Sequence, residues 1–496
     1  MNKFLNFLCL CCLVFFCVCF AISSNSPITT LHIIPLLLTF LLIILYLYSD
    51  NKIEQIRKSF WIRPSMLLLL SLVIVNLQIP INIFVGLGDG SYYLESSKYA
   101  ICSGEVLFFG CIGIISFIYG YHYRVLSKPH NNFGNICKSP VLIWVLLSLL
   151  SFILWVINID LNSFLTGMEY QGSGAADRVS SPFAIFETLL DCFITISFAV
   201  ITKNNINRKN VKWSFFLYLK SIPMLLLLVI GFYMGLRMMS GDRGPVIYTG
   251  LMLFYSYVIT TQKKIKLLVL VSMVIVGAFS LTLLNVVRNF RNPNETFSER
   301  LTRGLDEMGD ITEKRTISPF THELAKSVNC NYIAVYDINN NITTYKYGGY
   351  NISELLVAVP GMNRVFKTFF DIDLYKFNSN EYLTISCFGK NYLFGLGTTA
   401  LADFYLDFGI LGMILGMFLI GFIYKRVDYY INNPVSNILL IICLLKFSSM
   451  SIYMPRASLS LILCRIFYIL IIYYIFSRIS LFFYTKKNFI NKKNSI

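Results

Sequence analysis

The feature that most constrains this chain is a series of twelve apolar stretches, each long enough to cross about 30 Å of hydrocarbon as a helix. Unpaired backbone polar groups are too costly in lipid for an open strand, and the stretches lack the alternating polarity of barrel strands. The sequence therefore predicts an all-α polytopic integral membrane protein. Its spans are expected at approximately 4–22, 31–48, 65–85, 101–121, 141–157, 183–201, 215–236, 244–260, 265–287, 404–424, 436–453 and 458–484.

The net charge of +16 suggests a nucleic-acid-binding protein until the charges are placed along the chain. Alternate connecting segments together hold 21 basic residues and three acidic ones, whereas the short segments between them hold few basic residues. This alternation is typical of the positive-inside rule, so both termini are expected in the cytoplasm. The positive charge thus reports membrane topology, and no nucleic-acid partner is expected.

One connection, residues 288–395, is far longer than the others and carries 12 Lys and Arg against 12 Asp and Glu. The alternation places this neutral segment on the outer side of the membrane. We therefore expect three regions. Residues 1–287 hold the first nine spans, residues 288–395 form the large outer loop, and residues 396–496 hold the last three spans and a basic cytoplasmic tail.

The long outer loop is expected to hold structure of its own, although a solvated decoration without chemistry is the alternative. Residues 353–370 interleave apolar and basic residues around a Pro-Gly break, as in short amphipathic helices at a membrane interface. Residues 298–310 have the pattern of a charged helix, and residues 378–399 are rich in Asn, Gly and Thr, as loops are. The loop also holds Cys330 and Cys387, which an oxidising compartment would allow to form a disulfide.

The first span has a second interpretation, as a cleaved signal peptide over residues 1–22. Lys3 then forms the basic start, and Cys19-Phe20-Ala21 forms a weak cleavage site. The remaining topology is the same in both cases. Outside the first apolar span, where Cys9 and Cys12 lie three residues apart, the sequence has no C-x-x-C. It has no His/Cys metal spacing and no phosphate-binding loop, so we predict neither a metal nor a cofactor.

Ionisable residues inside or beside spans are costly in lipid, which makes them functional candidates by default. Most of those in this chain fall in the outer half of the membrane, and only Lys220 lies near the cytoplasmic end. This distribution predicts a polar cavity that opens to the outside. The residues concerned are Glu105, Glu187, Asp191, Arg237, Arg243, Arg288, Arg291, Asp403, Asp407, Lys446, Arg456 and Arg465.

Arginines beside carboxylates at the outer leaflet favour an enzyme that acts on a lipid-linked phosphate, because guanidinium groups match phosphate geometry and stay charged. Asp403 is the candidate that takes the proton from an attacking hydroxyl, and His322, the only histidine of the long loop, is a second candidate base. The alternative is that these charges only form ion pairs between helices. The candidate ligands of phosphate or pyrophosphate are Arg237, Arg243, Arg288, Arg291, Arg456 and Arg465.

Two stretches of the sequence resemble a known family. Residues 235–250, GLRMMSGDRGPVIYTG, and residues 395–424, GLGTTALADFYLDFGILGMILGMFLIGFIY, resemble the O-antigen polysaccharide polymerases called Wzy and the related oligosaccharide repeat-unit polymerases. The acidic position of the second motif is Asp403, where the family more often has Glu, and the shorter side chain reduces its reach by one methylene. The other matching residues are Gly241, Arg243, Gly244, Tyr405, Leu406, Phe408, Gly409 and Gly412.

The resemblance implies a metal-independent enzyme of the bacterial inner membrane that acts at its periplasmic face. Such an enzyme transfers a growing glycan from undecaprenyl pyrophosphate to a new lipid-linked repeat unit. The resemblance further implies the fold of the lipid-dependent glycosyltransferases that include O-antigen ligase, a large periplasmic loop, and a Wzz-type co-polymerase as a partner that sets chain length.

Two other functions remain open at this stage. One is an O-antigen ligase or a similar lipid-dependent glycosyltransferase, which differs in its acceptor. The other is a flippase of lipid-linked oligosaccharides. A flippase is expected to have short outer loops and charges along a path through both leaflets, so the 108-residue outer loop and the sparse charge of the inner half argue against it.

Overall fold

The computed structural model describes residues 2–51, 62–87, 98–123, 140–159, 182–208, 211, 213–240, 242–263, 302, 319–359, 361–390, 395–434 and 436–493. Every regular element within these ranges is a helix, which confirms the predicted all-α class. Seven of the described helices are long and apolar enough to cross a membrane, or eight if one sharply bent pair counts as a span. The predicted count of twelve is not confirmed. The predicted span at 265–287 lies outside the described residues, as do 298–310 apart from residue 302.

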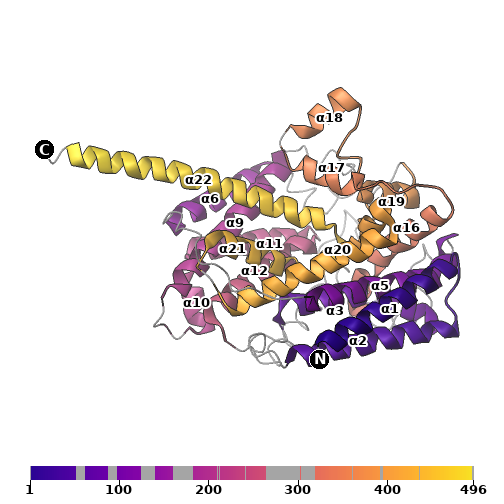
Figure 1. Ribbon diagram of the computed structural model, residues 1–496. Coiled ribbons are helices and arrows are strands. Elements are labelled where there is room, and N and C mark those ends of the chain that lie inside the picture. Colours follow the sequence, from indigo (N-terminus) through magenta and orange to yellow (C-terminus); the bar gives the residue numbers. More distant parts are fainter. Residues whose placement is uncertain are drawn as a thin grey trace.

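The first group of helices surrounds α5 (Ser103–His122), which is buried along nearly its whole length. Around it pack α1 (Asn2–Ile22), α2 (Ile33–Asn51), α3 (Pro64–Phe84) and α20 (Ala400–Asn432). Figure 1 shows α1, α2, α3 and α5 side by side, with α20 crossing them. Cys9 and Phe16 of α1 are fully buried, so in this structure the first span is part of the helical core.

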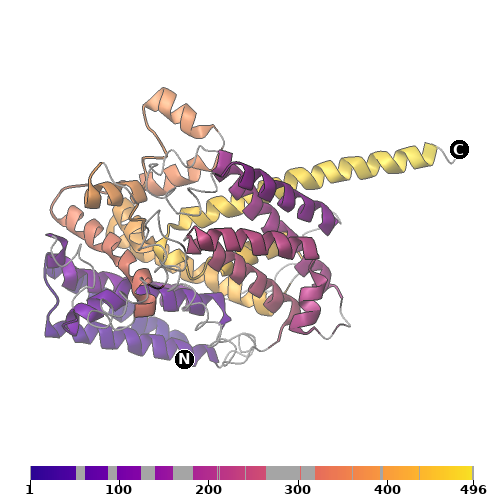
Figure 2. The same cartoon turned by 180° about the vertical axis from the view of Figure 1, so that it is seen from behind.

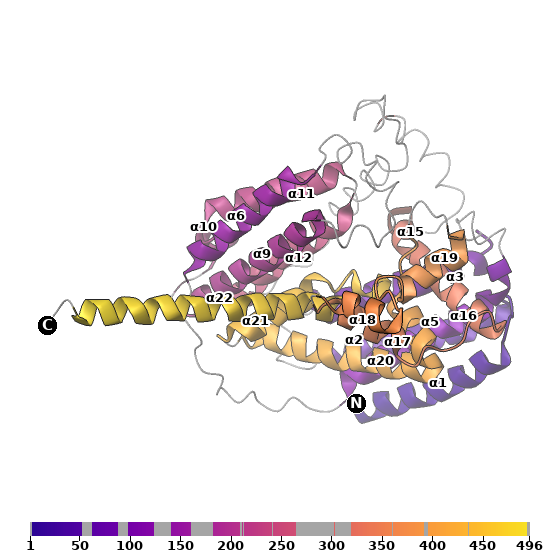
Figure 3. The same cartoon turned by 90° about the horizontal axis from the view of Figure 1, so that it is seen from above.

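The second group consists of α6 (Val141–Ile157), α9 (Pro182–Ile206), α11 (Met224–Met239) and α12 (Arg243–Thr261). Seen from above, these helices lie apart from the first group, and α21 (Ile438–Ser449) and α22 (Leu459–Lys493) run between the two (Figure 3). From behind, α22 is seen to extend well beyond the body of the molecule (Figure 2). Because α6 and α21 have only 17 and 12 residues, both are shorter than the helices that pass the span criteria.

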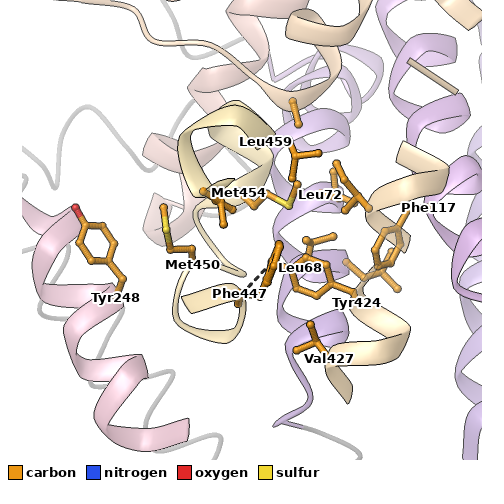
Figure 4. Close-up of a cluster of buried hydrophobic side chains, with 14 of the residues drawn as sticks. Leu68, Leu72, Phe117, Tyr248, Tyr424, Val427, Phe447, Met450, Met454 and Leu459 are labelled. Carbon is orange, nitrogen blue, oxygen red and sulfur yellow. Dashed lines mark hydrogen bonds between the residues drawn. The ribbon is translucent and has the colours of Figure 1, made fainter. Parts of the chain in front are cut away.

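The two groups meet in a cluster of apolar side chains (Figure 4). Leu68 and Leu72 of α3 contribute to it together with Tyr424 and Val427 of α20 and Phe447 of α21, and all five are buried. The Tyr424 hydroxyl donates a 3.0 Å hydrogen bond to the Phe447 carbonyl, so its polar end is satisfied inside the apolar cluster. This contact fixes α20 against α21.

Glycines allow α5 and α20 to approach each other closely. A Cβ atom at Gly120 would lie 2.0 Å from the Phe418 carbonyl oxygen, and one at Gly421 would lie 2.1 Å from the Phe117 carbonyl oxygen. Both clashes are with backbone atoms, which cannot rotate away. Small residues at such crossings are the usual means of helix association in lipid.

The predicted span at 215–236 is wrong as a single helix. It consists of α10 (Phe215–Ser221) and α11, which are bent by 100° relative to each other. The break lies at Ile222 and Pro223, because proline has no N–H to continue the helix and its ring keeps the preceding residue extended.

The described part of the expected long loop is largely helical. It contains α15 (Pro319–Ala325), α16 (Asn329–Asn339), α17 (Gly349–Val357), α18 (Met362–Phe370) and α19 (Ser379–Phe388). Three of these helices, α16, α17 and α19, pack at one end of α20. Residues 353–370, where short amphipathic helices are expected, contain the end of α17 and the whole of α18. The expected loop at 378–399 is wrong over residues 379–388, because the Asn378 side chain caps α19 by accepting from the Glu381 N–H.

The opposite end of α20 holds a charge that the sequence placed in a connecting segment. Asp428 lies within α20 and is fully buried, 3.9 Å from the equally buried Arg63 at the start of α3. Below, the end of α20 that packs against the loop helices is called the Asp403 end, and the other the Asp428 end.

Candidate functional site

α9 carries two carboxylates one helical turn apart, and each binds a basic residue from another helix. Asp191 accepts hydrogen bonds of 2.6 and 2.8 Å from Lys446 Nζ of α21. Glu187 is paired with Arg237 of α11. Because side chains four residues apart lie on one face of a helix, α9 brings these two pairs together in a single polar region.

Arg465 of α22 completes this region. Its guanidinium Nη1 lies 3.9 Å from Asp191 Oδ2, and its Cζ lies 5.0 Å from the centre of the Tyr248 ring of α12. The Arg465 side chain is 28% exposed, whereas that of Lys446 is completely buried. We call Arg237, Lys446 and Arg465, with Glu187, Asp191 and Asp242, the cation cluster.

Arg237 is held more tightly than Arg465. Besides Glu187 it bonds Asp242 Oδ2 at 3.3 Å, and its Cζ lies 5.3 Å from the Trp155 ring centre. Asp242 also caps α12, since its Oδ1 accepts from the Gly244 N–H at 3.3 Å. Two carboxylates and an aromatic face therefore occupy Arg237, which fits an anchor between α9, α11 and α12 better than an open phosphate ligand.

Arg456 borders the cation cluster. It ends a short 3₁₀ turn, Met454–Arg456, and its guanidinium lies 5.7 Å from the centre of the Tyr453 ring. The Tyr453 ring is in turn 6.2 Å from that of Tyr248. The half-buried Arg456 and the partly exposed Arg465 thus flank the same pair of tyrosine rings.

The other predicted phosphate ligands are described only in part. Arg243 begins α12 directly after Asp242, so its backbone lies beside the cation cluster. Arg288 and Arg291 lie outside the described residues.

A second group of ionisable residues lies at the Asp403 end of α20. Asp403 is fully buried, and its Oδ1 accepts a 2.7 Å hydrogen bond from the Ser379 hydroxyl of α19. Its Oδ2 is buried without a hydrogen-bond partner among the described residues. Glu354 of α17 and Asp407 both interact with it electrostatically. We call Glu354, Asp403 and Asp407 the carboxylate cluster.

Asp407 has a clear structural role in this cluster. Its two oxygens accept from the Tyr350 and Asn351 N–H groups at 3.0 and 2.9 Å, and from Asn351 Nδ2 at 2.8 Å. These donors lie in the first turn of α17, where N–H groups have no partner within the helix and a negative charge is favourable. Asp407 thus attaches α17 to α20.

The motif residue Gly409 breaks α20 just after Asp407. It has φ +68°, where residues with a Cβ atom are strained, and the Tyr345 ring lies against it. The carbonyls of Leu406 and Asp407, released by the break, accept the N–H groups of Lys346 and Tyr347 at 2.9 and 2.7 Å. The glycine therefore lets the loop before α17 join the backbone of a span.

Glu354 is half-buried, and its Oε2 accepts a hydrogen bond from the Ser458 hydroxyl. Burial, together with the charge of Asp407, raises the pKa of the Glu354 carboxyl to about 7, although the Ser458 hydrogen bond opposes the shift. Glu354 therefore titrates near neutral pH.

The beginning of α22 connects the two clusters. Ser458 directly precedes this helix and accepts from the Leu461 N–H at 3.2 Å, and Arg465 follows seven residues after Ser458. Seven residues are close to two helical turns, so the two positions share a face and are separated by about 10 Å along the axis. A carboxylate and a partly exposed guanidinium thus lie along one face of α22.

The remaining predicted site residues lie elsewhere. His322 is on α15, a helix that packs against α3 and carries neither cluster. Cys330 and Cys387 are free thiols, and the Cys330 thiol donates to the Gly397 carbonyl, so the structure does not contain the predicted disulfide. Among the described residues, no group of three or more His, Cys, Asp or Glu side chains is arranged to hold a metal ion.

Several site residues were missed from the sequence. Asp242 carries a usable signal, an Asp directly before a helix, whereas Tyr248 is an ordinary aromatic residue of an apolar span. Glu354 carries none, because a charged residue in a long loop is normally solvated, and only its packing against α20 and α22 makes it unusual.

The comparisons with known proteins identify one family. The sequence profile of the family described as O-antigen polysaccharide polymerase Wzy matches residues 4–488. No curated protein and no solved structure matches the chain. The matched region includes every residue of both clusters and both motifs. Because the match covers nearly the whole sequence, the chain belongs to the O-antigen polysaccharide polymerase Wzy family of membrane glycosyltransferases, which join lipid-linked oligosaccharides.

Proposed function

We propose that this polymerase transfers a growing glycan from undecaprenyl pyrophosphate to the non-reducing end of a lipid-linked repeat unit. The reaction takes place at the periplasmic face of the bacterial inner membrane, with both chain termini in the cytoplasm. The family membership and the asymmetry of Lys and Arg along the chain support this orientation. In this orientation both clusters and the loop helices face the periplasm.

The observation that carries the proposal is the exposure and the weak pairing of the Arg465 guanidinium. It is the most exposed cation of its cluster, and its nearest carboxylate is also bound by Lys446 at a shorter distance. A guanidinium held on one side by an aromatic ring and a distant carboxylate retains donors for a phosphate. We assign the pyrophosphate of the donor to Arg465 and Arg456, with Arg243, Arg288 and Arg291 as further ligands.

The chemistry follows from this assignment. When the bond between the anomeric carbon and the pyrophosphate breaks, negative charge develops on the leaving oxygen, and fixed guanidinium groups stabilise it. Arg237 and Lys446 hold the surrounding helices in place through their carboxylate partners. In the proposed reaction arginine side chains stabilise this charge, and a metal ion has no role. A Wzz-type co-polymerase that sets chain length is part of the proposal as a partner.

The test compares surface polysaccharide on a gel from cells with a deletion, wild type, Arg465→Ala or Arg243→Ala. Arg478→Ala is the matched control, because Arg478 is exposed on the same helix, where it stacks on Tyr474. We expect a ladder from wild type and Arg478→Ala. We expect a single repeat unit from the deletion, from Arg465→Ala and from Arg243→Ala. If the deletion removes the single-unit band as well, the protein acts before or after polymerisation. A full ladder from Arg465→Ala would place the donor site elsewhere.

A further inference from the structure

We propose that Glu354 is the catalytic base that takes the proton from the acceptor hydroxyl, and that Asp403 and Ser458 are its positioning residues. This inference rests on the proposed function and assigns the acceptor side of the same site. It replaces Asp403, the base expected from the sequence, with a residue that the sequence did not mark.

Accessibility separates the three members of the carboxylate cluster. A base must come within about 3 Å of the proton that it removes. Asp403 and Asp407 are fully buried, whereas Glu354 is only half-buried. Asp407 is also occupied by three donors at the start of α17. Glu354 is therefore the most exposed member of the cluster, and the one best placed to meet an acceptor sugar.

The surroundings of Glu354 hold its side chain in place but do not bond every carboxylate oxygen of the cluster. One oxygen accepts from Ser458, and behind it lies Asp403, whose Oδ2 is buried without a hydrogen-bond partner among the described residues. A buried carboxylate oxygen without a donor is expensive in a finished core. The Asn351 amide and Glu354 both act on Asp403, so a proton carried by the carboxylate cluster would satisfy this oxygen.

The placement of Glu354 relative to the cation cluster suits a direct displacement. Ser458, which holds Glu354, is about 10 Å along α22 from Arg465. Glu354, bound to Ser458, and Arg465 therefore lie along the same face of α22, about two helical turns apart. An acceptor held at Glu354 and a pyrophosphate held at Arg465 would approach the reacting carbon from different directions, as a direct displacement requires.

The proposed step is balanced without a further reactant. The acceptor oxygen forms a bond to the anomeric carbon of the donor as its proton moves to a Glu354 oxygen. The bond from that carbon to the pyrophosphate oxygen breaks, and its electron pair leaves with the pyrophosphate beside Arg465. Glu354 then releases the proton to water before the next transfer.

The titration of Glu354 supports this role. Burial and Asp407 raise its pKa to about 7, and a base works best when its pKa lies near the operating pH. The titratable groups that face it are Asp403 and Asp407 from α20 and Cys464 from α22, whose thiol donates to the Glu354 carbonyl at 3.3 Å. Because Glu354 must be ionised to accept a proton, the rate should rise with pH through about 7.

The test uses the purified full-length protein and single lipid-linked repeat units extracted from cells that lack the polymerase. We expect Glu354→Gln to lower turnover by about 100-fold or more with little change in KM, and Glu354→Asp to recover part of it. The rising limb near pH 7 should disappear in Glu354→Gln. Glu381→Gln, the same chemical change on α19, is the control. It should keep both the wild-type rate and the rise of the rate with pH near 7.

Ser458→Ala provides a second readout that does not depend on losing the carboxylate. The Ser458 hydroxyl stabilises ionised Glu354, so its removal should move the rising limb to higher pH. Wild-type turnover in Glu354→Gln, or an unshifted limb in a folded Ser458→Ala protein, would overturn the assignment. If wild type itself fails to extend the lipid-linked units, the proposed function fails instead.

Discussion

The two ends of α20 each bury an aspartate, but the hydrogen bonding of the two carboxylates differs. At the Asp428 end both carboxylate oxygens are bonded. Oδ1 accepts from the Ser65 N–H at 3.3 Å, and Oδ2 accepts from the Ser65 hydroxyl and, at 2.9 Å, from the Tyr121 hydroxyl. Arg63 lies beside Asp428, and its guanidinium packs near the rings of both Tyr46 and Tyr121. The Asp428 carboxylate is therefore bonded at both oxygens and buried from solvent.

The Asp403 end is incomplete by comparison. One oxygen of Asp403 lacks a hydrogen-bond partner among the described residues, Glu354 is half-buried, and Arg465 is partly exposed. Removing a partner from a complete buried network costs folding free energy. Groups that remain incomplete are instead available to a substrate. The comparison teaches that a buried carboxylate bonded at both oxygens marks a structural network, whereas partly exposed charged groups beside a buried carboxylate mark a candidate site.

The largest effect is expected at the crossing that holds the Asp428 end closed. Gly120→Ala places a Cβ 2.0 Å from the Phe418 carbonyl oxygen, so α5 and α20 must separate. We expect little folded protein, measured as the monodisperse peak of a fluorescent fusion in size-exclusion chromatography. Gly231→Ala is the control, because a Cβ there meets nothing within 4 Å. Equal peaks from both variants would contradict the close crossing.

The next effect concerns the sealed charges themselves. Asp428→Asn leaves Arg63 buried beside a neutral amide, and breaking such a pair typically costs about 3–5 kcal/mol. The variant should have a lower melting temperature in detergent, while the protein that remains folded still polymerises. A variant of wild-type stability that makes no polymer would assign Asp428 to the working site and erase the contrast between the ends.

A smaller effect is expected within the cation cluster, between Asp191 and Lys446. Asp191→Asn leaves the buried Lys446 without its counter-charge, and Lys446→Met removes the closest partner of Asp191. The double variant should be more stable than the sum of the single losses predicts, with a coupling of about 1–3 kcal/mol. Thermal melting of all four proteins measures this coupling. Strictly additive losses would show that the pair does not act as a unit.

The sequence predicted the helical class well, because hydrophobic length is a local property. Eleven of the twelve predicted spans fall on described helices, although not all of these helices meet the length and hydropathy of a span. The break at Pro223 was visible as a proline in an apolar run. The cap at Asn378 was visible as well, as Asn followed three residues later by Glu. Both were overlooked because the surrounding composition favoured another structure.

The site was predictable only in part. The cost of charge in lipid marked Glu187, Asp191, Lys446 and Arg465, and the structure brings these side chains together. That rule does not tell a tightly paired Arg237 from an open Arg465, since pairing depends on contacts between distant helices. It also does not apply to Glu354, whose burial results from the kink at Gly409 and the packing of α17 on α22.

The most direct test of this account makes the same substitution at both ends. Arg63→Met and Arg465→Met each remove one guanidinium while keeping an apolar side chain of similar length. Folded protein and polysaccharide ladder length are then measured in the same cells. We predict that Arg63→Met loses folded protein, and that Arg465→Met keeps folded protein at the wild-type level but produces only single repeat units. A full ladder from a folded Arg465→Met protein would contradict the central claim that the donor binds beside Arg465, near the Asp403 end of α20.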